Sequence, residues 1–166
     1  MITIKTGNIF DSNKDVLVNP INCVGVMGKG LALDFKNKYP NMFLKYKEAC
    51  SQGKVIPGKL YYYIQDGKVK VLNFPTKNHW RNNSEISYII SGLDYFKKYY
   101  SKMKIESIAF PALGCGNGKL NWDTIGPLMY EKLKYIPIDI EIYAPFGTDP
   151  NKLTIEFLEG GINNEN

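Results

Sequence analysis

A glycine-rich loop between a short apolar run and an amphipathic stretch constrains the fold of this chain most strongly. The apolar run, residues 16–18, predicts a buried strand, and residues 31–39 predict a helix. Between them lie Gly25, Gly28 and Gly30. Glycines let the backbone approach a ligand closely, and a helix N-terminus presents unpaired N–H groups and the positive end of its dipole. The segment therefore predicts a strand–loop–helix unit that can hold an anion.

This loop matches neither standard phosphate-binding fingerprint. The spacing from Gly25 to Gly30 differs from the dinucleotide motif, and Lys29 is followed by glycine where a P-loop has Ser or Thr for magnesium. On spacing alone, a phosphate-binding loop and an ordinary tight turn are equally well supported. Asn19 and Asn22 in the same stretch add amides that can exchange hydrogen bonds with sugar hydroxyls.

The composition indicates a single globular domain. The chain has 166 residues, of which 44% are hydrophobic and 22% charged, and its formal net charge is +5. The lysines are spread along the chain, so the charge gives only weak support for a nucleic acid or nucleotide partner. No apolar stretch approaches the roughly 18 residues of a membrane span, and the N-terminus lacks a signal-peptide core. We therefore expect a cytoplasmic protein with no membrane contact.

The three cysteines do not form a recognisable framework. Cys23, Cys50 and Cys115 are an odd number and include no Cys-x-x-Cys pair, which argues against disulfides and against a zinc site. Other metal ligands do not cluster either. The sequence therefore predicts neither a metal nor a cofactor.

Strand and helix patterns alternate along most of the chain, with a hairpin signal at Asp66-Gly67. Strands are predicted at residues 2–5, 16–19, 59–65, 68–74, 105–110 and 138–143. Helices are predicted at residues 31–39, at 40–51, from a Ser84 cap to about 100, and from Asn121 or Asp123 to about 133. This order predicts an α/β fold, a three-layer α/β/α sandwich with a mixed central sheet. Residues 1–155 are assigned to this domain and residues 156–166 to a C-terminal tail or linker.

A second glycine-rich loop, residues 114–118, also follows a predicted buried strand. Ligands of such sheets bind at the carboxyl ends of the strands, where both loops are expected to meet. Two such loops can wrap a diphosphate with backbone amides, without a metal or a lysine clamp. Their combination favours diphosphate binding over two unrelated turns.

A third loop, residues 73–81, carries the only histidine of the chain, His79, beside Lys77, Trp80 and Arg81. A lone histidine is more often structural than catalytic, and basic and aromatic residues are common in solvated loops. As a functional site, the loop offers a lysine that becomes nucleophilic when desolvated, a titratable imidazole and a stacking surface for a base. A Cys–His nucleophile pair, with Cys23 or Cys115, stays open at this point but has no evident third orienting group. Paired carboxylates are absent from the glycine-rich loops.

Three motifs resemble those of macrodomains, the ADP-ribose-binding α/β/α family. They are Asn22-Cys-Val-Gly-Val-Met-Gly-Lys-Gly-Leu-Ala, Asn73-Phe-Pro-Thr-Lys-Asn-His-Trp-Arg81 and Leu113-Gly-Cys-Gly-Asn-Gly-Lys-Leu-Asn-Trp122. The resemblance covers nearly the whole chain, from residue 7 to residue 146. Within the family, the motifs are most similar to the branch that includes the terminal ADP-ribose protein glycohydrolases, and there to the DNA ADP-ribosyl glycohydrolase antitoxins of the DarG type.

The resemblance implies that ADP-ribose lies across the strand ends. Asn8 and Ile9 would meet the adenine, where many macrodomains have Asp in place of Asn8, and Asn22 would hold the distal ribose. The full implied ADP-ribose site, in addition to Asn22, is Asn8, Ile9, Asn19, Ile21, Gly28, Lys29, Gly30, Leu31, Thr76, Gly114, Cys115, Gly116, Asn117, Gly118, Pro145 and Phe146.

The resemblance also implies the chemistry. Lys77 matches the lysine on which removal of ADP-ribose depends in this branch, with Asn22 orienting the ribose and His79 assisting proton transfer. Two roles for Lys77 stay open at this point: a nucleophile that forms a Schiff base, or a hydrogen-bond donor that favours ring opening and departure of the leaving group. Trp80 and Arg81 would contact DNA. The protein-directed members have an aspartate where this chain has Gly118, which favours a DNA-directed activity.

The expected activity is hydrolysis of ADP-ribose from thymine in single-stranded DNA, which reverses a cognate ADP-ribosyltransferase toxin. The alternatives are a non-catalytic ADP-ribose reader, a phosphatase or deacylase of another ADP-ribose derivative, and a hydrolase of protein-linked ADP-ribose. Lys77 favours a glycohydrolase, because this lysine has no clear role in a reader, a phosphatase or a deacylase.

Overall fold

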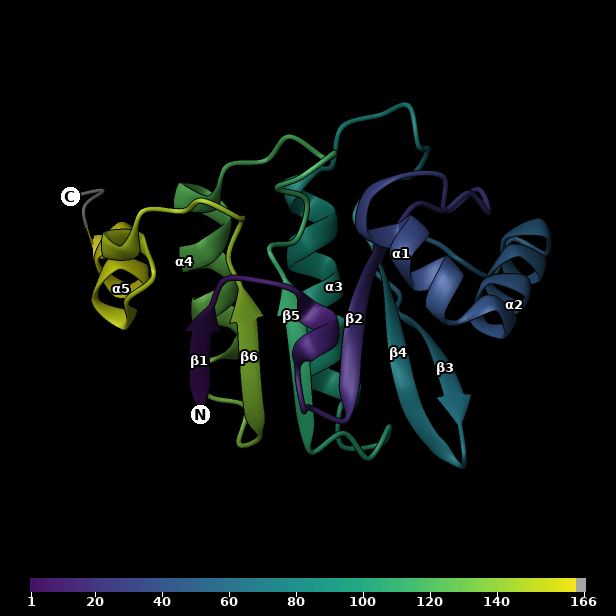
Figure 1. Cartoon of the computed structure of the whole chain (residues 1–166), viewed down its shortest axis with the longest axis horizontal. Coiled ribbons are helices and arrows are strands. Elements are labelled where there is room, and N and C mark those ends of the chain that lie inside the picture. The colour runs from purple at the N-terminus through teal and green to yellow at the C-terminus, as the bar shows by residue number, and fades with distance from the viewer. Residues whose placement is uncertain (164–166) are drawn as a thin grey trace.

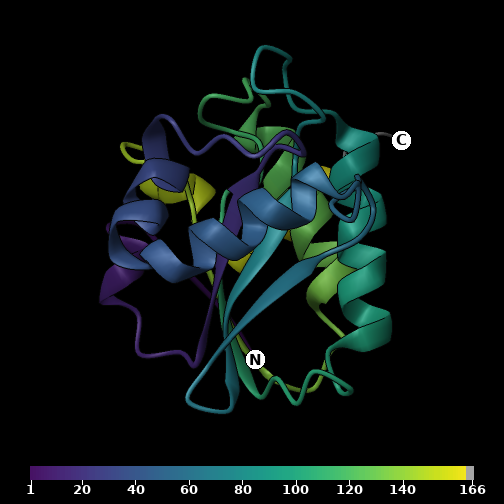
Figure 2. The ribbon, with the colours of Figure 1, turned by 90° about the vertical axis from the view of Figure 1, so that its right-hand side faces the viewer.

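The computed structural model of this chain describes residues 1–163. It contains a mixed β-sheet with helices on both faces (Figures 1 and 2). The six strands lie in the order β1-β6-β5-β2-β4-β3. Their bounds are β1 Ile2–Lys5, β2 Val16–Ile21, β3 Tyr61–Gln65, β4 Lys68–Pro75, β5 Ser107–Pro111 and β6 Asp139–Tyr143. Only the β3–β4 pair is antiparallel within this sheet. The predicted α/β/α class with a mixed sheet is confirmed.

The helices divide between the two faces of the sheet. Their bounds are α1 Gly30–Lys38, α2 Pro40–Ser51, α3 Ile86–Tyr99, α4 Trp122–Leu133 and α5 Ile155–Asn163, with short 3-10 helices η1 Ile9–Asp11 and η2 Pro150–Lys152. Helices α1 and α2 cover one face of the sheet (Figure 2). Phe35 and Tyr46 of these helices belong to the core cluster on that face. Helices α3 and α4 cover the other face. Alternate strand residues point to opposite faces, so each strand serves both cores.

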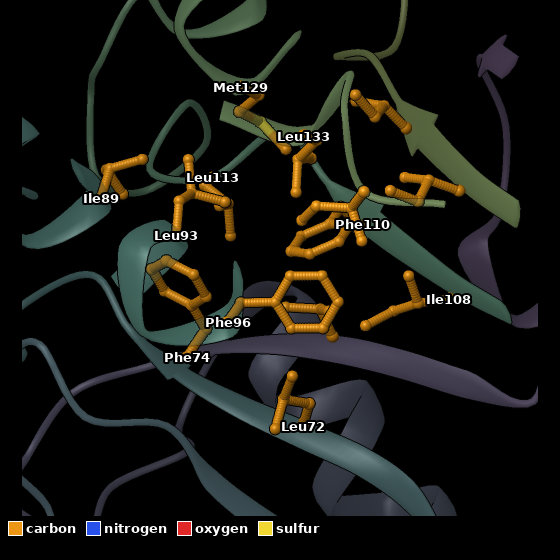
Figure 3. Close-up of a cluster of buried hydrophobic side chains, with 14 of the residues drawn as sticks. Leu72, Phe74, Ile89, Leu93, Phe96, Ile108, Phe110, Leu113, Met129 and Leu133 are labelled. Carbon is orange, nitrogen blue, oxygen red and sulfur yellow. The ribbon is translucent and has the colours of Figure 1, made fainter. Parts of the chain in front are cut away.

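The larger core lies between the sheet and helices α3 and α4 (Figure 3). Phe96 of α3 meets Phe110 of β5 edge to face, with ring centroids 5.4 Å apart. Gly92 allows α3 to approach the sheet closely, because a Cβ there would lie 2.3 Å from Cζ of Phe74. This packing fixes the end of β4, which leads into the third loop.

The β3–β4 hairpin forms as the sequence predicts. Asp66 and Gly67 have positive φ angles of 54° and 79°, which a two-residue turn of type I′ requires. The predicted cap of α3 is wrong, however. Glu85 occupies the N-cap position without a side-chain cap bond, and Ser84 is buried one residue earlier with no hydrogen-bond partner for Oγ. Tertiary packing of Ser84 against the second glycine-rich loop takes precedence over local capping.

The C-terminal segment begins as a helix. In α5, which starts one residue before the expected tail or linker, Leu158 is fully buried and packs in the core beside α4. Residues 164–166 of that expected segment lie outside the described residues. None of the helices in residues 1–163 has the length and apolarity needed to cross a membrane.

Strands β2 and β5 pair at only two positions, near their amino-terminal ends. The pairing joins Val16 to Ile108 and Leu17 to Ala109, whereas β2 pairs with β4 as far as Ile21. Beyond Ala109, therefore, the neighbouring strands no longer hold each other at their carboxyl ends. This is where the cavity of the candidate site begins.

Candidate functional site

A cavity of about 880 Å³ opens at the carboxyl edge of the sheet. The segments that line it follow strands β1, β2, β4, β5 and β6, as the topology predicts for a sheet of this kind. The lining includes nearly all the ligand-binding residues that the sequence indicated: Asn8, Ile9, Ile21, Gly28, Lys29, Gly30, Leu31, Thr76, Gly114, Cys115, Gly116, Asn117, Gly118, Pro145 and Phe146. Asn22, Lys77 and Trp80 also line it.

The first glycine-rich loop presents the N-terminus of α1 to the cavity. Lys29 occupies the N-cap position without a side-chain cap bond, so the first N–H groups of the helix, from Gly30 onward, have no capping partner. Gly30 has a φ angle of 60°, and a Cβ at this position would lie 2.6 Å from Nδ2 of Asn117. Glycine is thus needed here both for the backbone angle and for contact with the second loop. The geometry suits an anion such as a diphosphate.

The second glycine-rich loop packs tightly on Ser84. A Cβ at Gly118 would lie 2.0 Å from Ser84 Oγ and 2.5 Å from the carbonyl oxygen of Gly114. The N–H of Ser84 donates to the carbonyl of Gly118 at 3.1 Å, and the N–H of Leu120 closes the loop onto Gly114 at 2.8 Å. No side chain fits at position 118 unless this loop changes shape.

Asn22 is held by its own loop and by α2. Its Oδ1 accepts from Tyr46 Oη at 2.8 Å and from the N–H of Val24 at 3.1 Å, and its Nδ2 donates to the carbonyl of Val26 at 2.7 Å. The Tyr46 hydroxyl also lies 2.8 Å from the Asn22 carbonyl. These bonds leave one N–H of the Asn22 amide for a ligand. Tyr46 is thus a supporting residue that the sequence analysis did not identify.

Lys77 reaches across the cavity to the second loop. Its Nζ donates to the carbonyl of Asn117 at 3.1 Å. No carboxylate forms an ion pair with it among residues 1–163. Burial, together with the nearby charges of Lys29 and Lys119, lowers the pKa of Lys77 from its usual value. The arrangement favours a fraction of neutral amine, which is the nucleophilic form.

The remaining residues of the third loop divide between the cavity and its outer rim. Trp80 lines the cavity with 42% of its surface exposed, and the Arg81 guanidinium lies 4.7 Å from the Trp80 ring centroid. His79 does not line the cavity, because its ring packs beside Trp80 and its Nδ1 accepts from the N–H of Arg81. Arg81 does not line it either.

The opposite end of the cavity suits a flat ring. Phe146 is 96% exposed there, beside Pro145, and Ile9 is buried. Oδ1 of Asn8 caps η1 by accepting from the N–H of Phe10 at 2.9 Å, which leaves the amide nitrogen of Asn8 as the free group. Asp34 is the acidic residue among those that line the cavity, and the sequence analysis did not identify it.

Asn19 lies elsewhere than the sequence indicated. It is fully buried in β2, where its Nδ2 donates to Oδ1 of Asn73 across the strand pair at 3.0 Å. It is not part of the cavity lining. Asn19 lies two residues before the end of β2, on the same face as Ile21 but further from the cavity, whereas Asn22 lies beyond the last residue of the strand.

The thiols do not support cysteine chemistry. Burial raises the pKa of Cys23 to about 11 and that of Cys115 to about 12, so both are neutral thiols near pH 7. Cys23 Sγ faces the backbone carbonyl of Lys77, and Cys115 Sγ faces that of Leu113. In the described part of the chain, no group of three or more His, Cys, Asp or Glu residues is placed to hold a metal ion.

Comparison with known proteins agrees with this geometry. Residues 18–129 match the family model of the Macro domain. The chain is 41% identical over 164 residues to the DNA ADP-ribosyl glycohydrolase of Mycobacterium tuberculosis, covering 96% of this chain and 46% of that protein. This chain therefore spans less than half the length of that curated relative.

Two solved structures are similar along most of the chain. The macrodomain of Mycobacterium tuberculosis DarG has a TM-score of 0.83 and 42% identity, covering 87% of this chain and 98% of that one. Thermosipho africanus DarTG in complex with ADP-ribose has a TM-score of 0.89 and 38% identity, covering 95% of this chain and 45% of that one.

Proposed function

We propose, on the premise that this chain belongs to the Macro domain family, that it removes ADP-ribose from single-stranded DNA by hydrolysing the bond to thymine. The relatives support this activity through their names, and the cavity supports it through its shape and chemistry. The observation that carries the proposal is Lys77, which has no carboxylate partner among residues 1–163 and whose Nζ donates to the Asn117 carbonyl of the second glycine-rich loop inside the cavity.

ADP-ribose would lie along the strand ends, with its adenine near Phe146 and its distal ribose near Asn22. The amides at the start of α1 and in the second glycine-rich loop face the same cavity and would hold the diphosphate. Phe146 would cover the adenine end, where its ring is exposed. The free N–H of Asn22 would then donate to a hydroxyl of the distal ribose and place the anomeric carbon near Lys77.

Lys77 would act as the nucleophile. Its neutral Nζ forms a bond to the anomeric carbon while the bond to thymine breaks, and the proton lost by Nζ passes to the thymine nitrogen. Opening of the ribose ring then gives a Schiff base, and water hydrolyses it to free ADP-ribose and the original lysine. The direction of the pKa shift of Lys77, downward through burial and the charges of Lys29 and Lys119, favours this step.

Trp80 and Arg81 are proposed to meet the DNA next to the modified base. A half-exposed indole beside a guanidinium offers a stacking surface that accepts any base. The roles of His79 in proton transfer and of an ADP-ribosyltransferase toxin as the cognate partner stay proposals from the family resemblance. His79 lies outside the cavity lining.

The test uses a single-stranded oligonucleotide that carries ADP-ribose on thymine. The protein should release free ADP-ribose, and Lys77→Ala should abolish release while ADP-ribose binding, measured by calorimetry, persists. Lys68→Ala, at the opposite edge of the sheet, is the matched control. Reduction with borohydride during turnover should trap a covalent adduct at Lys77. No release by the wild-type protein, with binding of ADP-ribose intact, would overturn the assignment for this substrate and favour a reader or a hydrolase of another ADP-ribose linkage.

A further inference from the structure

Two further lysines flank the glycine-rich loops around Lys77, and their ammonium groups are distinct from the backbone amides proposed to hold the diphosphate. Lys29 lines the cavity at the start of α1, and Lys119 directly follows the second glycine-rich loop. Both side chains are exposed. The diphosphate already has backbone amides on both sides of the cavity, so these two ammonium groups have no evident role toward it.

A single residue, Asn117, links the positions of all three lysines. Its carbonyl accepts from Lys77 Nζ at 3.1 Å, and its amide nitrogen packs against Gly30, next to Lys29 in the chain. Lys119 follows two residues later. The charges of Lys29 and Lys119 both act on Lys77, which agrees with this proximity.

Neither flanking lysine is neutralised by the protein. Five ion pairs are present in residues 1–163, and they use the N-terminus, Lys5, Lys132, Lys134 and Lys152. Lys29 and Lys119 form none of them. Their positive charges act on the same part of the site as Lys77 and favour the binding of a polyanion there.

The loop also fixes the backbone at Lys119. Its φ angle of 64° lies in the left-handed region, which costs a non-glycine residue about 1–2 kcal/mol, although glycine occurs repeatedly in the same loop. The N–H of Lys119 donates to the carbonyl of Gly116 at 3.1 Å, so the loop fixes this conformation. The turn therefore holds the Lys119 backbone in one conformation at the end of the second glycine-rich loop.

We propose that Lys29 and Lys119 bind the phosphates of the DNA strand on either side of the modified nucleotide. This inference rests on the proposed function and assigns the part of the site that tells a DNA substrate from free ADP-ribose. Trp80 lines the same cavity and offers a neighbouring base a surface for stacking. Phosphate contacts position a strand without reading its sequence.

The test measures how binding of an ADP-ribosylated single-stranded oligonucleotide depends on salt. All proteins carry Lys77→Ala to prevent turnover. Each phosphate contact to single-stranded DNA contributes about 0.7 to the slope of log affinity against log salt. Lys29→Gln and Lys119→Asn should each reduce the slope by about 0.7. Between about 50 and about 200 mM salt, the affinity of the double variant should therefore fall about sevenfold less than that of the parent.

Controls separate this role from a structural one. Asparagine tolerates left-handed backbone, and Lys119→Arg keeps the charge and should keep the parent slope. Lys119→Gly serves as a second neutral variant, and unfolding midpoints establish that each variant is folded. Lys68→Gln and Lys102→Gln, exposed at the opposite end of the sheet, should leave the slope unchanged.

The proposal is overturned if folded Lys29→Gln and Lys119→Asn keep the parent slope, or if the two distant variants reduce it equally. Turnover by the protein with Lys77 intact is measured in parallel on the same oligonucleotide. Absence of release there overturns the proposed hydrolase function, whereas the salt slopes still decide whether the two lysines bind DNA.

Discussion

Gly118 shows how a single residue determines what this site can contain. The family resemblance implies an aspartate at this position in glycohydrolases that act on proteins. This chain has a glycine there, and its surroundings leave no space for a side chain. Both a neighbouring side chain, Ser84, and a backbone carbonyl, that of Gly114, occupy the volume. The absence of a carboxylate beside Lys77 is thus built into the loop and is not only a choice of residue.

Gly118→Ala should therefore destabilise the protein. The new methyl group must displace Ser84 or the Gly114 carbonyl, and overpacking of this kind costs about 1–3 kcal/mol. Gly116→Ala is the matched control in the same loop, because a Cβ there meets nothing within 4 Å. Urea denaturation should show a lower midpoint for the first variant only. Equal midpoints would mean that the loop adapts without cost.

The rate of ADP-ribose release should rise with pH. Burial and the charges of Lys29 and Lys119 lower the pKa of Lys77. Because the nucleophile is the neutral amine, the reactive fraction of Lys77 increases as the pH rises toward that pKa. Lys119→Asn removes one repelling charge, raises the pKa and should move the profile to higher pH. Single-turnover rates on ADP-ribosylated thymidine, which lacks flanking phosphates, measure both profiles. A rate that falls with pH would assign Lys77 as a cationic hydrogen-bond donor instead.

The sequence placed Asn22, Lys77 and both glycine-rich loops after apolar strand patterns, and all of them line the cavity. Their roles toward ADP-ribose came from the family resemblance and stay predictions. The sequence also placed Asn19, three positions before Asn22, in the same site. The structural difference between the two residues depends on where β2 ends, and strand ends are set by pairing with β4, which no local pattern reveals. The wrong prediction that Ser84 caps α3 has the same cause, because Ser84 is buried against Gly118, a residue in a distant segment of the chain.

Helix α2 acts on the site although none of its residues lines the cavity. Its Tyr46 is buried and holds both the carbonyl and Oδ1 of Asn22, 24 residues away in the chain. The bounds of α2 were predictable from Pro40 at its first position and from its periodicity. The contact was not, since an apolar face containing a tyrosine does not indicate which backbone atom the hydroxyl meets.

Tyr46→Phe should weaken both the fold and the site. It removes the donor to Asn22 and leaves a buried amide oxygen with fewer partners, which costs about 1–2 kcal/mol. The freed Asn22 should also bind ADP-ribose less tightly. Thermal unfolding and calorimetry measure the two effects, and Tyr135→Phe, on a residue 77% exposed, is the control. Unchanged affinity in a destabilised Tyr46→Phe protein would separate Asn22 orientation from binding.

At the scale of the whole molecule, the order of strands creates the site. The alternation of strands and helices along the sequence predicted the three layers. It did not predict that β2 and β5 are neighbours in the sheet, or that they pair at only two positions near their amino-terminal ends. This divergence opens the edge between two segments, near Pro20 of β2 and Pro111 of β5, and both prolines line the cavity. Proline lacks an N–H, so it suits strand ends that leave the ladder.

The stability of the whole fold should fall in acid because of Glu141. Burial opposes its ionisation, but hydrogen bonds from Lys5 and Ser12, at 2.6 and 2.5 Å, and the Lys5 charge outweigh burial and lower the pKa of Glu141. A carboxyl whose pKa is lower in the folded state stabilises the fold above its unfolded pKa, near about 4.3. This contribution is lost as the pH falls through the lower folded-state value. The interaction joins β1, β6 and the segment after η1.

Glu141→Gln should therefore destabilise the protein at pH 7 and flatten its stability between about pH 5 and about pH 3. Because Lys5 is half exposed, the loss at pH 7 should be only about 1–2 kcal/mol. Urea denaturation at a series of pH values measures both effects. Glu131→Gln breaks a surface pair with Lys134 and should change neither, since that pair remains solvated. If Glu141→Gln keeps the full acid dependence of the parent, other carboxyl groups control that dependence, and the ion pair between Lys5 and Glu141 contributes little to the stability of the fold.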